Sequence, residues 1–92
     1  MIVGTLKMRL FLRESHSLKD KRRVVKSLKD RIRHKFNVSV AEVEEQDHHR
    51  QAVLGVAVVT NDAKLADSIL QNVLNLARWH RSAELTSFDV EI

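Results

Sequence analysis

Hydrophobic periodicity constrains this chain most, because strand-like and helix-like spacing follow each other twice in the same order. In residues 1–12 nearly every second side chain is apolar, which is typical of a half-buried strand. From Leu18 the apolar positions recur three, four and seven residues apart, so a helix is expected to begin there. The β-branched stretch 38–43 predicts a second strand, bulged where its apolar positions change parity between Val40 and Val43.

The second half of the chain repeats this plan. Residues 52–59 are almost wholly apolar, so we expect a central strand there. Thr60, Asn61 or Asp62 can cap the helix that follows, and the last strand is expected over 84–92. The side chains expected to face the core are Leu54, Val56 and Val58, then Leu65, Ile69, Val73, Leu76 and Ala77, and finally Phe88, Val90 and Ile92.

Two interleaved strand-helix-strand units predict an α+β fold, the ferredoxin-like βαββαβ sandwich. Its four strands form an antiparallel sheet with both helices on one face. A chain of 92 residues can bury one core but not two, so residues 1–92 are expected to form a single domain. Trp79, after the second helix, is expected to close one edge of that core. The other face of the sheet is left uncovered.

The absence of cysteine excludes a disulfide framework, a thiolate zinc site and a cysteine nucleophile. The amino-terminal residues lack the basic and apolar pattern of a signal peptide, and no apolar run is long enough to cross a membrane. We therefore expect a cytoplasmic protein with no membrane partner.

Positive charge is concentrated in the first part of the chain. Residues 1–36 carry twelve Lys and Arg against three Asp and Glu, whereas residues 37–92 carry four against nine. This asymmetry favours a polyanion as the partner of the basic part. Five cations spaced three and four residues apart on the first helix form the basic stripe: Lys19, Arg22, Lys26, Lys29 and Arg33.

Side chains of the basic stripe can reach successive phosphates of RNA and gain affinity by releasing counterions. Two other interpretations stay open at this point. The stripe can be a solvated face that Asp20 and Asp30 partly neutralise, or it can dock on the acidic surface of a protein.

The uncovered sheet face lacks the aromatic rings with which RNA-recognition motifs stack bases, because Phe11 is the only aromatic expected there. Small and apolar residues on such a face usually indicate a protein contact. We expect a homo-oligomer, a dimer packed through its sheets, in which Lys7 or Arg9 meets acids of the partner's last strand, Asp89 or Glu91. Its contact face is expected to comprise Val3, Thr5, Phe11, Val53, Gly55, Ala57, Val59 and Leu85.

An enzymatic interpretation rests on the turn at residues 13–17, because a helix start attracts anions and acylphosphatases use this loop of this fold. Arg13 and Asn61 are the residues that such a hydrolase would use. The chain lacks the glycine-rich phosphate cradle of those enzymes, since Gly4 and Gly55 are its only glycines. We therefore predict no catalytic residue.

The adjacent His48 and His49 lie among acidic residues, a composition that can suggest a metal site. Neighbouring side chains of an extended segment point apart, however, and no second pair of ligands supports them. The sequence therefore predicts a solvated loop, with no metal site and no cofactor.

Three segments resemble the YlxP-like family of small, uncharacterised bacterial proteins: Ser17–Arg23, Phe36–Glu42 and Gln46–Asp47. The resemblance covers essentially the whole chain. It implies a ferredoxin-like fold in a bacterial, cytoplasmic protein and supplies no active site. Genes of this family often lie beside those for translation initiation and ribosome-maturation factors, which implies ribosomal RNA as a partner.

The residues and the resemblance together predict a non-enzymatic binding module that associates with structured RNA or the ribosome through the basic stripe. Two alternatives remain. One is a scaffold that recruits a protein through the uncovered sheet face, and the other is an acylphosphatase-like hydrolase acting on an anion.

Overall fold

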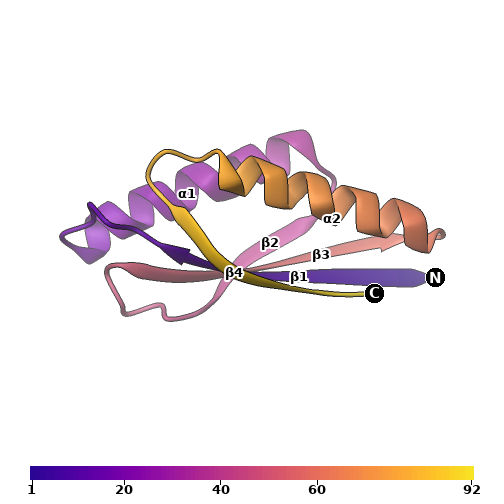
Figure 1. The fold of residues 1–92 in the computed structure, drawn as a ribbon, viewed down its shortest axis with the longest axis horizontal. Helices are drawn as coiled ribbons and strands as arrows, with labels where there is room; N and C mark the ends of the chain where they lie inside the picture. Colours follow the sequence, from indigo (N-terminus) through magenta and orange to yellow (C-terminus); the bar gives the residue numbers. More distant parts are fainter.

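The computed structural model describes all residues from Met1 to Ile92 and confirms the ferredoxin-like fold (Figure 1). Its elements are β1 (Ile2–Phe11), α1 (Leu18–Lys35), β2 (Ser39–Glu44), β3 (Gln51–Thr60), α2 (Ala63–Arg78) and β4 (Glu84–Glu91). The strands form one antiparallel sheet in the order β2-β3-β1-β4. Both helices lie on the same side of this sheet, and its other side is the open sheet face.

Each helix begins at a side-chain cap. Ser17 Oγ accepts a hydrogen bond from the backbone N–H of Asp20, and the Asp20 carboxylate accepts one from the N–H of His16. This reciprocal pair satisfies two amides at the start of α1 and confirms the expected first residue of that helix. Asp62 caps α2 in the same way, accepting from the N–H of Lys64 at 2.9 Å.

The core fills the space between the sheet and the helices, and the side of α2 that enters it differs from the expectation. Leu65 is half-exposed, and Ile69 and Leu76 are only partly buried. The sequence contains two adjacent apolar rows on this helix. Packing selects the row that holds two alanines, because small residues let the helix lie closer to the sheet. The buried side chains of α2 are Ala66, Leu70, Val73, Leu74 and Ala77.

Two bulges shift the strand register. The bulge expected in the second strand is confirmed, since the pairing of β2 with β3 shifts between Glu42 and Glu44. A second bulge in β4 was not expected. Arg9 pairs with Ser87 but Leu10 pairs with Leu85, so one residue of β4 is left over. Leu85 therefore lies on the helix side of the sheet, packed against the core, and its assignment to the open sheet face is wrong.

The end of β4 is less buried than its apolar residues suggested. Val90 packs against the core as expected. Phe88 pairs with Met8 and so faces the helix side, yet it stays exposed because β4 is an edge strand. The guanidinium of Arg78 lies 5.5 Å from the centre of its ring. Ile92 lies beyond the last strand and is also exposed, so its inward assignment is wrong, whereas Phe88 faces the expected side without being buried.

Candidate nucleic-acid interface

The basic stripe lies on the side of α1 that faces the edge strand β2. Arg33 marks this orientation, because its guanidinium donates a 3.0 Å hydrogen bond to the carbonyl of Val40 in β2. Lys29 is half-buried, and the other four cations of the stripe are exposed. Asp30 lies 2.8 Å from Lys26, and this hydrogen bond lowers the pKa of Asp30 below its ordinary value. The stripe is therefore continuous but partly neutralised at its centre.

Most cations of α1 have no partner within the chain. The helix carries nine Lys and Arg against two Asp. Only Lys21, Lys26 and Arg33 pair with an acid or a carbonyl. The cations without such a partner are Lys19, Arg22, Arg23, Lys29, Arg31 and Lys35. They leave a field of positive charge on the helix layer, which is what an extended anion requires.

Lys21 has a structural role that was not expected from the sequence. It is completely buried, its Nζ lies 2.8 Å from Glu42 Oε2 of β2, and it also donates to the carbonyl of Glu45. The carboxylate oxygen is oriented for an ion pair rather than for a well-directed hydrogen bond. The helical spacing already indicated that Lys21 is buried. It lies four residues before Val25, and the buried residues Leu28 and Ile32 follow three and four residues further on.

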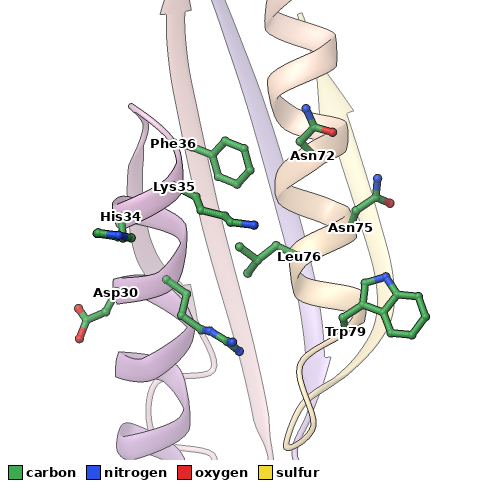
Figure 2. A pocket seen from close by; sticks show the side chains of 9 residues that line it. Asp30, His34, Lys35, Phe36, Asn72, Asn75, Leu76 and Trp79 are labelled. Atoms are coloured by element: carbon green, nitrogen blue, oxygen red, sulfur yellow. The ribbon is translucent and has the colours of Figure 1, made fainter.

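An open groove of about 1130 Å³ separates the carboxyl-terminal halves of α1 and α2 (Figure 2). We call it the interhelical groove. Phe36 and Leu76 form its apolar part, and Figure 2 shows Lys35 and Leu76 directed into the space between the helices. Arg31 also lines it. Asp30 is the one acid among the lining residues, and Figure 2 shows it pointing away from α2. The groove is therefore positively charged.

Trp79 does not close the core, and that expectation is wrong. Its side chain is 86% exposed. The cause is helical geometry, because Ala77 faces the sheet and a residue two positions later lies about 200° further around the axis. Trp79 ends α2 as its C-cap, and its ring points away from α1 (Figure 2). The structure thus leaves the single tryptophan of the chain in solvent, on the rim of the interhelical groove.

Cationic side chains also lie near the end of α2. Arg78 and Arg81 line a second hollow there, together with His80. Burial lowers the pKa of His80, and the positive charge of Arg31 lowers it further. His80 therefore stays neutral at lower pH than an ordinary histidine. The end of α2 thus carries an exposed ring close in the sequence to Arg78 and Arg81, and Arg31 of α1 lines the same groove as the ring.

The open sheet face shows most of the expected contact residues, with corrections. Val3 and Val59 pair across strands and are 46% and 66% exposed. Val53 is only 1% exposed, because it lies between its register neighbours Arg9 and Glu44, whose side chains bond across it. The remaining expected residues on this face, exposed or half-buried, are Thr5, Phe11, Gly55 and Ala57.

The carboxylate of Glu44 pairs with both cations of the open sheet face. Both Lys7 and Arg9 form ion pairs with its carboxylate within the chain. The hydrogen bond from Lys7 lowers the pKa of Glu44. The acids of β4, Asp89 and Glu91, lie on the same face with no basic partner within the chain. The open sheet face therefore carries more unpaired negative than positive charge.

The structure does not bring together the residues of the enzymatic interpretation. Arg13 follows the end of β1 and pairs with Glu84 at 3.1 Å. Asn61 follows the end of β3, beside the start of β1, because Ile2 pairs with Thr60. The two side chains therefore lie at opposite ends of the sheet.

The histidines of the β2–β3 loop have a structural role. His48 Nδ1 accepts hydrogen bonds from the backbone N–H groups of Arg50 and Gln51, which orders the return into β3. The His49 ring stacks on that of His48, with centroids 5.8 Å apart. No group of three or more His, Asp or Glu side chains is arranged to hold a metal ion.

Comparison with known proteins gives the family. Residues 3–90 match a family model described as a protein of unknown function, DUF503. The chain belongs to this family. A relative named "Uncharacterized protein YlxP", from Bacillus subtilis (strain 168), is 33% identical over 73 residues, which cover 79% of each chain. The YlxP-like resemblance is therefore confirmed.

Solved structures similar to this member of the DUF503 family show its fold. A de novo designed protein, LFR1 1 with ferredoxin fold, matches all of this chain and 87% of its own with a TM-score of 0.60 at 14% identity. The designed protein Foldit4 matches 99% of this chain and 98% of its own, with a TM-score of 0.61 at 13% identity. At these identities the likeness concerns the fold alone. No helix of this family member is long and apolar enough to span a membrane.

Proposed function

We propose that this protein is a non-enzymatic module that binds structured RNA through its helix layer. The observation that supports the proposal most is the set of six cations on α1 that have no partner within the chain. Three of them, Lys19, Arg22 and Lys29, lie on the basic stripe, and cations in such a row gain affinity for a phosphate backbone by releasing its counterions. Ribosomal RNA is the structured RNA to test first, because the family resemblance implies genes beside those of ribosome-maturation factors.

The distribution of charge between the two faces supports the helix layer as the docking side. The open sheet face carries Glu44, Asp89 and Glu91, and its two cations are already paired. A polyanion is repelled by that face and attracted by the helices. The sheet also lacks base-stacking rings other than Phe11, over which the guanidinium of Arg13 lies. The protein thus differs from RNA-recognition motifs, which bind bases on the sheet.

Charge reversal on the basic stripe tests this proposal. Lys19→Glu/Arg22→Glu is expected to weaken binding to a structured ribosomal RNA fragment at least about tenfold, because both side chains are exposed and unpaired. The slope of log affinity against log salt is expected to become shallower by about 2, one unit for each lost phosphate contact. Fluorescence anisotropy of labelled RNA at several salt concentrations measures both quantities.

Lys64→Glu is the matched control. Lys64 is an exposed cation in the first turn of α2, away from the stripe, and its reversal makes the same change in charge per residue. It is expected to leave the affinity within about twofold. If the control weakens binding as much per charge as the double variant, the net charge of the protein drives binding and the stripe has no special role.

We also propose that two copies associate through the open sheet face. The exposed pair Val3 and Val59 supports this surface. Val59→Glu is expected to shift a dimer to the monomer in sedimentation experiments, because each copy then brings a charge into the apolar contact. Leu65→Glu changes another exposed apolar residue, 49% exposed against 66% for Val59, on α2 and is expected to leave the dimer intact. A wild-type protein that stays monomeric at high concentration contradicts this proposal.

A further inference from the structure

Trp79 is the most exposed large apolar side chain of the chain apart from the first residue, and it is left in water at the end of a helix. An exposed indole ring keeps a large apolar surface in contact with water, so this surface is available for contact with a ligand. Resting on the proposed function, we propose that Trp79 forms a stacking platform for an unpaired base of the bound RNA.

The surroundings of the ring fit a nucleotide. Arg31 and Lys35 line the interhelical groove together with Trp79, and Arg78 and Arg81, close to Trp79 in the sequence, line a second hollow near the end of α2. Arg31, Lys35 and Arg81 have no acidic partner within the chain, so they are free to meet phosphates. Proteins that bind single strands combine these two features, a ring that stacks on a base and cations that follow the backbone.

Polar groups that can meet the edge of a base lie beside the ring. Asn72 and Asn75 are on the same rim as Trp79, about two turns and one turn of the helix before it, respectively (Figure 2). The side-chain oxygen of Asn75 accepts a hydrogen bond from Arg78 at 3.3 Å, which leaves its amide N–H groups for an acceptor. An asparagine amide presents a donor and an acceptor, as the edges of bases do.

Two of the three acids that line these hollows are paired: Asp30 with Lys26 and Glu84 with Arg13. The third, Glu14, lines the second hollow and not the interhelical groove. A tryptophan at the centre of a protein contact is typically enclosed by apolar and neutral residues. Here the apolar residues of the interhelical groove are Phe36 and Leu76 besides Trp79 itself, and the remaining rim is polar or charged. The chemistry of this rim favours a nucleotide over an apolar protein segment.

The chain provides its own probe for the test, because Trp79 is the single tryptophan and there is no tyrosine. The probes are a hairpin of ribosomal RNA sequence with a short single-stranded overhang and the same hairpin with a blunt end. Stacking on a base is expected to quench at least about half of the Trp79 fluorescence with the overhang hairpin and much less with the blunt one. Trp79→Ala is expected to weaken binding of the overhang hairpin about tenfold, whereas the blunt hairpin binds as before.

Trp79→Phe keeps an aromatic face and is expected to retain most of the affinity for the overhang hairpin. Because the side chain is exposed, neither variant is expected to alter the fold, which circular dichroism checks. If both hairpins bind the wild type and Trp79→Ala equally, without quenching, the stacking site is refuted and RNA binding by the helix layer stands. If neither hairpin binds the wild-type protein at all, the proposed function fails and the stacking site fails with it.

Discussion

Lys21→Ala is expected to lower the free energy of unfolding by about 3 kcal/mol, a large part of the stability of a domain of this size. The substitution removes the cation of a buried pair and leaves the Glu42 carboxylate without its counter-charge on the helix side of β2. The carbonyl of Glu45 loses its donor at the same time. Urea denaturation followed by circular dichroism measures the change.

Lys26→Ala is the matched control for burial. Lys26 also pairs with an acid, Asp30, at the same 2.8 Å, but both side chains are exposed. Removal of such an exposed surface pair is expected to change the stability far less than removal of the buried Lys21 pair, because water screens the attraction. If the variants at Lys21 and Lys26 lose equal stability, burial of the Lys21 pair has no energetic consequence.

A double variant separates the loss of a partner from the loss of the pair. Lys21→Met/Glu42→Leu replaces both charges with apolar side chains of similar size, and its stability is expected to lie within about 1 kcal/mol of the wild type. It also keeps the test interpretable if Lys21→Ala does not fold. A double variant as unstable as the single one would indicate that the contact with Glu45, rather than the unpaired carboxylate, carries the effect.

The pair matters for the shape of the molecule because it joins α1 to the β2–β3 hairpin. Glu45 follows β2 and has a positive φ of 59°, a conformation that non-glycine residues rarely adopt. Lys21 holds the carbonyl of this residue. We infer that the lysine fixes the loop that follows β2 relative to the basic stripe on the same helix.

Gly4→Val is expected to destabilise the fold by about 2–3 kcal/mol, a fall of roughly 10–20 °C in Tm. A Cβ at position 4 would lie 3.1 Å from Leu70 Cδ1 and 3.4 Å from Ala66 Cβ, both on α2, and 3.3 Å from Val58 Cγ1. The two further methyl groups of valine find no space there. Glycine at this position therefore allows α2 to lie close to β1, and differential scanning calorimetry measures its replacement.

Gly55→Val is the matched control, since it makes the same change in the neighbouring strand. A Cβ there would meet only the side chain of Val43, at 3.0 Å, on the open sheet face. Val43 is exposed in a bulged edge strand and has room to move. The preference of valine for strands offsets part of the remaining strain, so a loss within about 1 kcal/mol is expected. Equal losses at both positions would contradict the close approach of α2 as the cause.

The order and type of the elements were predictable from the sequence because they depend on local spacing. The period of two in residues 1–12 and the helical spacing from Leu18 to Ile32 each follow from one buried face. The bulge of β2 was expected from a change of parity in its apolar positions, but the exposed Val43 lies on the face opposite the buried Val40, so the bulge does not bring both residues into the core. The cations of the basic stripe were likewise identified by their spacing alone.

The errors arose where a side chain has two possible environments that local spacing does not distinguish. Trp79 was assigned to the core by its size, but its position two residues after Ala77 directs it outward. Lys21 was assigned to no face because lysine is rarely buried, although its spacing matches that of the core. Leu85 lies on the helix side of the sheet, and not on the expected open face, because of a bulge in β4 that the apolar pattern of that strand did not predict.

For this protein, local periodicity and composition were sufficient to derive the ferredoxin-like fold and the basic character of α1, because both depend on neighbours along the chain. The interhelical groove, the exposure of Trp79 and the pairing of Lys21 with Glu42 depend on which row of α2 packs on the sheet and on how α1 meets β2. Those choices are made between segments distant in sequence, where close packing selects one arrangement among several that the local pattern allows.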